Sequence, residues 1–400
     1  MKKNGISLIV LIVTIIVIII LAAVVILTLS KNNPIESAKE ATFKENLRAV
    51  QYQVEMYIAS RYQKELNDFD INTLNISGET LVSDFGMPVK YKDKIAVADG
   101  SLIYTGKDAK EKIWAEDIKI SVGIPVPNKW KAYISSIEYG VPIPKGFTYK
   151  EGTKATGVVI EDSSHNEFVW IPVDGTNIKY EKFTTFNGTT PTGDDALPTG
   201  VTNEEADVNM YHGFYIGRYE ATIPDNATSP TDSTGIPTCK SKRTVWTNIS
   251  YNNAKPNAES MYTGKNTSVQ SGLLTGTAWD TTCKWIENEI TKINESSTLN
   301  DSRFYGNYKN SQSPANSGKG SKHEAGYNEN WKTKNIYDLA GNVWEWTYEA
   351  FSSGRIGRGG SCSYDGDSYP VSYRYNYLLS YTHDRIGFRL RLYIKTNWQS

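Results

Sequence analysis

The sequence predicts an α+β chain in which a membrane helix leads into a small domain and then into a larger, irregular domain. Three patterns support this prediction: an apolar run at residues 6–29, an amphipathic helical repeat after it, and short strands from about residue 140 onward. Long connections rich in Gly, Asn, Ser and Thr separate those short strands. We therefore expect a leader and membrane helix, a small extracytoplasmic domain, a linker and a large domain, at residues 1–30, 31–121, 122–140 and 141–400.

The composition excludes several classes of protein. The 43 basic and 44 acidic residues leave a net charge of −1, so no global positive field would attract nucleic acid, and we expect no nucleic-acid partner. The three cysteines are too few for a disulfide-stapled scaffold. The four histidines and three cysteines also lack the paired spacing of a zinc site.

The apolar run at residues 6–29 is long enough to cross a membrane. As a helix it would extend for about 36 Å, which spans the hydrocarbon core of a bilayer. A cleaved signal peptide has a shorter apolar region of roughly 7–15 residues. Lys2 and Lys3 precede the run, which favours a cytoplasmic N-terminus. We expect a single-pass protein of the cell membrane whose C-terminal domain is extracytoplasmic.

The first residues also resemble the N-terminus of type IV pilins and pseudopilins, in which a short basic leader ending in Gly precedes a long apolar helix. The resemblance implies cleavage of the leader between Gly5 and Ile6. In that family the fifth mature residue is usually a Glu that pairs with a neighbouring subunit, whereas this chain has Val10 there. Without that charge the segment suits a plain membrane anchor, and assembly into a surface filament stays an open alternative.

The small domain is expected to consist of a helix on a small antiparallel sheet. After residue 33, apolar residues recur at helical spacing: Leu47, Val50, Val54, Ile58, Tyr62 and Leu66. Residues 94–105 form two alternating runs around Asp99-Gly100, which predicts a hairpin. This arrangement also resembles pilin-like domains. The Pro-rich residues 124–128 are predicted to be a spacer.

The large domain begins with short predicted strands. We expect a hairpin of residues 158–160 and 167–173, a strand at 213–222 and a surface loop at 185–202. A helix is predicted at 277–293, since four apolar side chains fall on one of its faces: Trp279, Cys283, Ile286 and Ile290. Cys283 is then a thiol of the core.

Residues 335–346 are predicted to form a buried corner. Trp344 and Trp346 would expose a large apolar area in a loop, while Glu345 between them needs a partner if it is buried. The nearby arginines are candidate partners for this carboxylate: Arg358, Arg389 and Arg391.

Five segments in order resemble the formylglycine-generating enzyme family, also called sulfatase-modifying factors, over roughly residues 140–395. They are FVWIPV at 168–173, FYIGRYEAT at 214–222, NIYDLAGNVWEWT at 335–347, RGGS at 358–361 and GFRL at 387–390. The resemblance implies an irregular, C-type-lectin-like α+β fold. Oxidase members hold copper with two cysteines, at the third and eighth residues after the Ser of Gly-Gly-Ser; here these are Tyr364 and Tyr369. Phenols are hard and protonated near neutral pH, so we expect neither copper nor oxidase activity.

The resemblance further implies a calcium ion in the same corner. In family members, side-chain and main-chain oxygens bind Ca²⁺ at positions that correspond to Asp338, Gly341, Val343 and Glu345. Such an oxygen set suits a hard cation. The alternative is that Glu345 accepts hydrogen bonds from the backbone or an arginine without metal, and the sequence leaves both open.

The segment 361–384 has the composition of a recognition surface. It holds six tyrosines among Ser, Asp, Asn and Gly: Tyr364, Tyr369, Tyr373, Tyr375, Tyr377 and Tyr381. Rigid rings with small polar neighbours are typical of binding surfaces, although tyrosines that only support the fold are an alternative. The composition also resembles the variable segment of lectin-fold proteins diversified by retroelements.

The sequence thus predicts a bacterial surface protein, membrane-anchored or pilin-like, that displays a non-catalytic lectin-like domain. This domain would bind an extracellular protein or glycan. Two alternatives remain: an enzyme of the same family with a divergent active site, and a structural pseudopilin.

Overall fold

The computed structural model describes residues 34–65, 74–98, 100–122, 130, 132–175, 177–183, 187–192, 204–263, 267–313 and 318–395. The chain divides into two units, residues 1–127 and 128–400. The predicted leader cleavage at Gly5 and Ile6 and the predicted membrane helix at 6–29 lie outside the described residues. Within the described part of the chain, no helix is both long and apolar enough to cross a membrane.

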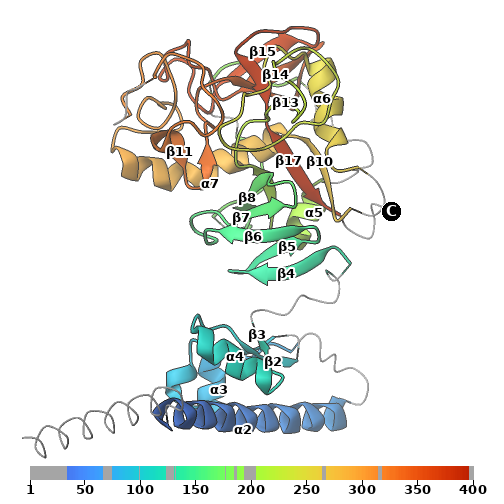
Figure 1. Cartoon of the computed structure of the whole chain (residues 1–400), viewed down its shortest axis with the longest axis vertical. Coiled ribbons are helices and arrows are strands. Elements are labelled where there is room, and N and C mark those ends of the chain that lie inside the picture. Colours follow the sequence, from blue (N-terminus) through green and yellow to red (C-terminus); the bar gives the residue numbers. More distant parts are fainter. Residues whose placement is uncertain are drawn as a thin grey trace, which may run out of the picture. The chain divides into compact units, whose positions relative to one another are not determined.

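The N-terminal unit contains the predicted helix and hairpin (Figure 1). Its elements are α2 (Pro34–Glu65), α3 (Gly78–Phe85), the 3-10 helix η2 (Val89–Tyr91), β1 (Ile95–Ala98), β2 (Ser101–Tyr104), α4 (Ala109–Asp117) and β3 (Ser121–Val122). The pairing of Ala98 with Ser101 confirms the predicted turn, and β3 adds a parallel strand that we did not predict. Leu47, Val50 and Val54 of α2 are buried in the core of this unit, as the helical repeat requires.

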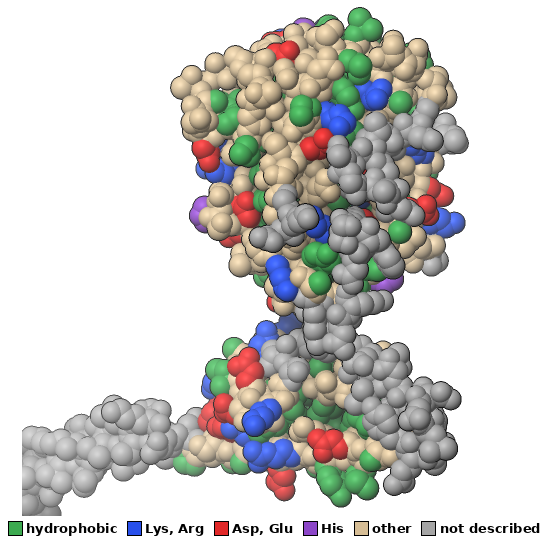
Figure 2. Space-filling model, turned by 90° about the vertical axis from the view of Figure 1, so that its right-hand side faces the viewer, with side chains coloured by type: hydrophobic (Ala, Val, Ile, Leu, Met, Phe, Trp, Pro, Cys, Tyr) green, Lys and Arg blue, Asp and Glu red, His purple; other side chains and the backbone are tan. Residues whose placement is uncertain are grey.

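The C-terminal unit contains a six-stranded antiparallel sheet in the order β10-β17-β9-β8-β7-β6. Its strands are β6 (Phe147–Glu151), β7 (Val159–Asp162), β8 (Glu167–Pro172), β9 (Gly213–Gly217), β10 (Val269–Leu273) and β17 (Leu390–Ile394). The hairpin of β7 and β8 confirms the prediction. On the face shown in Figure 2, most of the described surface of this unit is uncharged, with basic and acidic side chains scattered over it.

The strand predicted at 213–222 is too long. β9 ends at Gly217, and Thr222 instead makes isolated bridges with Thr238 and Val245. Arg218, directly after β9, still donates its backbone N–H to the carbonyl of Glu167 and its guanidinium to the carboxylate of the same residue. A local alternation of apolar residues does not reveal such a contact.

A second sheet has four strands in the order β15-β14-β13-β16. β13 (Trp344–Phe351) pairs antiparallel with β14 (Gly354–Arg358), which pairs antiparallel with β15 (Arg374–Leu378). β16 (Ile386–Phe388) runs parallel to β13. Residues 187–192, part of the predicted surface loop, lie along β15, where Thr189 donates to the carbonyl of Arg374. This sheet brings the corner at 335–346 and the tyrosine-rich segment together.

Two short hairpins complete the strands: β4 (Ile134–Glu138) with β5 (Val141–Pro144), and β11 (Lys332–Thr333) with β12 (Ile336–Tyr337). β4 lies inside the predicted linker at 122–140. Because β4 pairs with β5, these residues belong to the C-terminal unit, and the linker is shorter than predicted.

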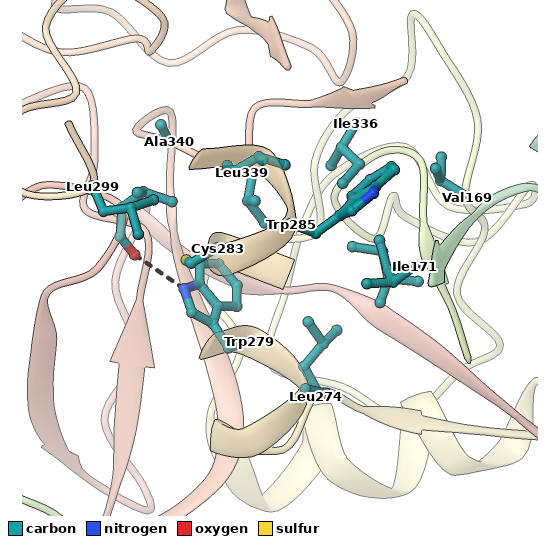
Figure 3. Packing of buried hydrophobic residues seen from close by; sticks show 14 of the residues in the cluster. Val169, Ile171, Leu274, Trp279, Cys283, Trp285, Leu299, Ile336, Leu339 and Ala340 are labelled. Carbon is teal, nitrogen blue, oxygen red and sulfur yellow. Dashed lines mark hydrogen bonds between the residues drawn. The ribbon is translucent and has the colours of Figure 1, made fainter. Parts of the chain in front are cut away.

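The helices of this unit are α5 (Glu204–Tyr211), α6 (Tyr251–Ser260), α7 (Gly276–Ile293) and the 3-10 helix η4 (Glu329–Trp331). α7 confirms the predicted helix, and its N-terminus is capped by Thr275, whose hydroxyl accepts from the backbone of Ala278. Trp279 and Cys283 on its inner face pack in the large core cluster (Figure 3), where the indole of Trp279 donates to the carbonyl of Val371 at 3.0 Å. Cys283 is fully buried, as predicted for a core thiol, and burial raises the pKa of this thiol.

Candidate functional site

The corner at residues 335–346 is buried, and the carboxylate of Glu345 in it has a partner, as predicted. Glu345 is 1% exposed, and Arg389 donates to both of its carboxylate oxygens, with an Nη2–Oε1 distance of 2.6 Å and an Nε–Oε2 distance of 3.0 Å. Arg389 also donates to the carbonyls of Gly217 and Tyr337 at 3.0 Å. These bonds compensate a charge that would otherwise be costly to bury.

The other two candidate arginines have different partners. Arg358 pairs with Asp280 at 2.6 Å and Glu349 at 2.9 Å, while Arg391 pairs with Glu204. Arg374 at the start of β15 joins the first group through both Asp280 and Glu349. Two arginines and two carboxylates therefore form a neutral, fully buried network that ties β14 and β15 to α7 and β13.

Three of the oxygens predicted to hold calcium accept hydrogen bonds from protein donors. The Oδ2 atom of Asp338 accepts from the backbone of Gly326 at 2.9 Å, and both oxygens of Glu345 accept from Arg389. Burial raises the pKa of Asp338 to about 7 and also raises the pKa of Glu345. Among the described residues, no group of three or more His, Cys, Asp or Glu side chains is arranged to hold a metal ion. The geometry is that of the arginine-paired alternative, and calcium binding stays a prediction.

Sequence reasoning missed Glu220, which lies beneath this corner. Its carboxylate is fully buried and accepts from the side chain of Asn342 at 2.7 Å and the backbone of Val343 at 3.3 Å. Burial raises its pKa well above the usual value, and the neighbouring Asp338 and Glu345 raise it further. The only sequence signal was its position within the segment 214–222.

All six predicted tyrosines gather in one cluster around Trp344, at the start of β13. Five rings contact the indole directly, with centroid distances of 5.6 to 6.3 Å: Tyr364, Tyr369, Tyr373, Tyr375 and Tyr377. Tyr381 stacks on Tyr377 at 4.9 Å. We call these seven residues the aromatic cluster.

A glycine in β14 allows this cluster to form. Trp346, Gly357 and Tyr375 are aligned across β13, β14 and β15, and side chains at alternate positions of a strand share a face. Because Gly357 has no side chain, the ring of Tyr377 lies over β14; a Cβ on Gly357 would be 3.0 Å from it. Tyr377 thereby reaches both tryptophans of β13, at 6.3 Å from Trp344 and 5.6 Å from Trp346.

The cluster has a buried base and an exposed rim. Trp344 is 2% exposed, whereas Tyr364, Tyr375 and Tyr381 are 41%, 39% and 40% exposed. The remaining three tyrosines are half-buried. The buried rings support the fold, and the exposed rings are available to a ligand.

A small pocket opens at one side of the cluster. Its volume is about 140 Å³, and it is lined by Trp344, Ser363, Tyr364, Tyr377, Tyr381, His383, Arg385 and Ile386. Sequence reasoning named the three tyrosines as binding residues and Trp344 as part of the buried corner, but assigned no binding role to the other lining residues. His383, Arg385 and Ile386 reach the pocket because β16 pairs in parallel with β13, and the sequence alone does not show this pairing.

The positions that correspond to the copper cysteines lie together in the cluster. The ring centroids of Tyr364 and Tyr369 are 4.6 Å apart. Cys239, Cys283 and Cys362 are all buried and free of disulfides. Cys362 lies two residues before Tyr364 and so is not at either of the two copper positions. Burial raises the pKa of its thiol.

Comparison with known proteins places the chain in a family. A sequence model described as "Sulfatase-modifying factor enzyme 1-like domain" matches residues 63–393. No curated protein sequence matches the chain. Three solved structures are similar, at TM-scores of 0.31, 0.31 and 0.33: Treponema denticola variable protein 1, PvdO from Pseudomonas aeruginosa, and CarF.

The first of these structures is 16% identical and covers 57% of this chain and 95% of its own. PvdO is 17% identical, with 62% and 100% covered, and CarF is 15% identical, with 57% and 99% covered. Sequence identities of 15–17% with TM-scores near 0.3 say nothing about the function of this chain. Since the family match extends over most of the chain, including β4 to β17, this protein belongs to the sulfatase-modifying factor enzyme 1-like domain family.

Proposed function

We propose that this chain is a membrane-anchored bacterial surface protein whose C-terminal unit binds an extracellular protein or glycan and catalyses no reaction. The aromatic cluster is the observation that carries the proposal. It presents three exposed tyrosine rings that pack on the buried Trp344 and on half-buried tyrosines, so their positions are fixed before a ligand arrives. Preorganised rings with polar tips contribute contact area at a low cost in conformational entropy.

The side chains at the family's copper positions support the non-catalytic part of the proposal. Monovalent copper prefers thiolates, and this site offers the phenols of Tyr364 and Tyr369 in their place. Burial raises the pKa of Tyr364 further, which keeps this phenol protonated at neutral pH. The nearest thiol, Cys362, is buried and has a raised pKa, so it is a poor nucleophile.

The membrane part of the proposal rests on the sequence. The apolar run at 6–29 would anchor the chain, and the basic residues before it favour an extracytoplasmic C-terminal unit. Leader removal between Gly5 and Ile6 belongs to the same proposal, and assembly into a surface filament is the alternative to a plain anchor.

An enzyme with a divergent active site is the second candidate. It is favoured by one observation: the pocket beside the cluster contains polar groups of different chemistry, namely Ser363, His383 and Arg385. In such an enzyme these side chains would act on a substrate held by the tyrosines.

Binding assays with the purified full chain test the proposal. We expect saturable binding to an immobilised glycan panel or to whole cells, and a loss of at least about tenfold when Tyr364, Tyr375 and Tyr381 are all replaced by Ala, since each buried ring contact contributes about 1 kcal/mol. Tyr139→Ala is the matched control, because Tyr139 is 47% exposed and lies outside the cluster. Oxidation of a cysteine-containing peptide in the presence of Cu⁺ would contradict the proposal.

A further inference from the structure

We propose that the pocket beside the aromatic cluster is a subsite for a carboxylate-bearing sugar, such as a uronic acid residue of a glycan. This inference rests on the proposed function and narrows it to one class of ligand. It is carried by the size of the pocket, its aromatic walls and the cationic group at its edge.

The size of the pocket suits one ring of a larger ligand. Its volume of about 140 Å³ is below the roughly 300–1,000 Å³ of sites that enclose a whole drug-sized molecule. Tyr364 and Tyr381 line the pocket and are also exposed, so they connect it to the outer surface of the cluster. One sugar would enter the pocket, and the rest of the glycan would lie on the exposed tyrosines.

The walls combine flat apolar faces with hydrogen-bonding groups. Tyr377 and Tyr381 are stacked with an interplanar angle of 11°, and Trp344 forms the base. Hydrogen-bonding groups of the lining are the hydroxyl groups of Ser363, Tyr364 and Tyr381 and the imidazole of His383. Sugar rings present both apolar C–H faces and hydroxyl groups, which matches this combination.

The charge at the edge of the pocket favours an anion. Arg385 lines the pocket with a side chain that is 37% exposed, and its Nη1 atom lies 3.4 Å from Asp384 Oδ1. A close guanidinium–carboxylate pair has a separation of about 2.7–2.9 Å, so this contact is loose. The Nδ1 atom of His383 lies 2.9 Å from the same oxygen and accepts from the backbone N–H of Arg385 at 3.2 Å. The Arg385 side chain also donates to the thiol of Cys362, and its exposed part can take a ligand carboxylate as a further partner.

The same charge argues against two other occupants. A cluster of tyrosines around a tryptophan could hold a quaternary ammonium ion, but Arg385 would repel a cation here. The side-chain carboxylate of an acidic peptide would satisfy Arg385 but would leave most of the ring-sized space unfilled. A sugar acid uses both the charge and the space.

Three methyl glycosides of similar shape test the inference: methyl glucuronide, methyl glucoside and methyl glucosaminide. Calorimetric titration of the full chain should give at least tenfold tighter binding of the glucuronide than of the glucoside, and the weakest binding of the glucosaminide. Arg385→Gln should abolish the preference for the glucuronide, while Arg385→Lys should retain part of it. Arg243→Gln is the matched control, since Arg243 is similarly exposed and also has a 3.4 Å contact, with Asp225.

The outcomes separate this inference from the proposed function. Equal binding of glucuronide and glucoside, no binding of any glycoside, or an unchanged preference in a folded Arg385→Gln variant would overturn the subsite. Tighter binding of an acidic peptide than of the glucuronide would also overturn it. If binding to the glycan panel or cells is then still lost in the triple tyrosine variant, the proposed function stands without the subsite; if it is unchanged, both fail.

Discussion

At the scale of single residues, the buried charges show what sequence reasoning reached and what it missed. The motif around Glu345 predicted a buried carboxylate and named three candidate arginines. Which arginine pairs with it is set by the parallel register of β13 and β16, where Glu345 lies opposite Gly387, two residues before Arg389. Register between segments so distant in the sequence has no local signature, so the partner could not be chosen.

Removing Arg389, the partner of Glu345, should lower the stability of the folded protein. We expect Arg389→Met to lower the free energy of unfolding by about 3–5 kcal/mol, because it leaves the Glu345 carboxylate buried without compensation. Urea denaturation measures the change. Lys240→Met is the control: its partner Asp225 is 60% exposed, and such surface pairs contribute about 0–1 kcal/mol. A loss below 1 kcal/mol for Arg389→Met would contradict the role given to this pair.

The effect of Ca²⁺ on thermal stability distinguishes the two interpretations of the corner at 335–346, namely a calcium site and a carboxylate paired with arginine. Because Arg389 occupies both oxygens of Glu345, we expect the melting temperature to differ little between millimolar Ca²⁺ and excess EDTA. A bound ion would stabilise the folded state according to its affinity, by about 2.7 kcal/mol at a hundredfold excess over Kd. A rise of several degrees in Ca²⁺ that is lost in Glu345→Gln would confirm the calcium prediction for Asp338, Gly341, Val343 and Glu345.

At the scale of elements, local patterns predicted local structure. The hairpins β1–β2 and β7–β8 and the helix α7 were found because their signals lie within about twenty residues. β15 was not found, because Arg374–Leu378 sits in a polar, tyrosine-rich segment without clear alternation. Its place in the sheet depends on the buried contacts of Arg374 with Asp280 and Glu349, which come from α7 and β13.

The glycine of β14 gives a prediction at this scale. A Cβ on Gly357 would lie 3.0 Å from the ring of Tyr377, so Gly357→Val should displace this ring and weaken ligand binding by about tenfold or more. Binding and urea denaturation are measured together. Gly235→Ala introduces a similar contact, at 3.1 Å from Trp246, outside the cluster and should leave binding unchanged. Unaltered binding by a folded Gly357→Val variant would show that Tyr377 does not shape the surface.

At the scale of the whole molecule, the sequence predicted two folded parts with a boundary near the observed one. The predicted linker at 122–140 contains the division between residues 127 and 128, but also includes β4, whose strand partner follows it directly. Each unit has its own buried core, one around α2 and one around α7. The family could be recognised because its motifs fall at the corner and along β8, β9 and β13, where packing restricts the choice of residue.

Because each unit has its own hydrophobic core, we expect each unit to fold without the other. We expect residues 128–400, expressed alone, to unfold in one cooperative transition at the temperature seen for this unit in the full chain. Scanning calorimetry of both proteins provides the comparison. A fragment that lacks a cooperative transition would show that the N-terminal unit is needed for its stability.

The N-terminal sequence gives the second prediction for the whole molecule. We expect the protein in the membrane fraction, with a mature N-terminus at Ile6 and a C-terminal unit that external protease can reach on intact cells. Mass spectrometry of the N-terminal peptide is decisive for the leader. An intact Met1 would rule out the pilin-like processing but not the membrane anchor.

The binding comparison between the wild-type chain and the variant with Tyr364, Tyr375 and Tyr381 replaced by Ala tests the central proposal most directly. The exposed rim of the aromatic cluster predicts saturable binding by the wild-type protein and a loss of at least about tenfold in the variant, measured at a temperature at which the variant is folded. Equal binding by the two proteins would contradict a recognition surface built on Trp344 and its tyrosines.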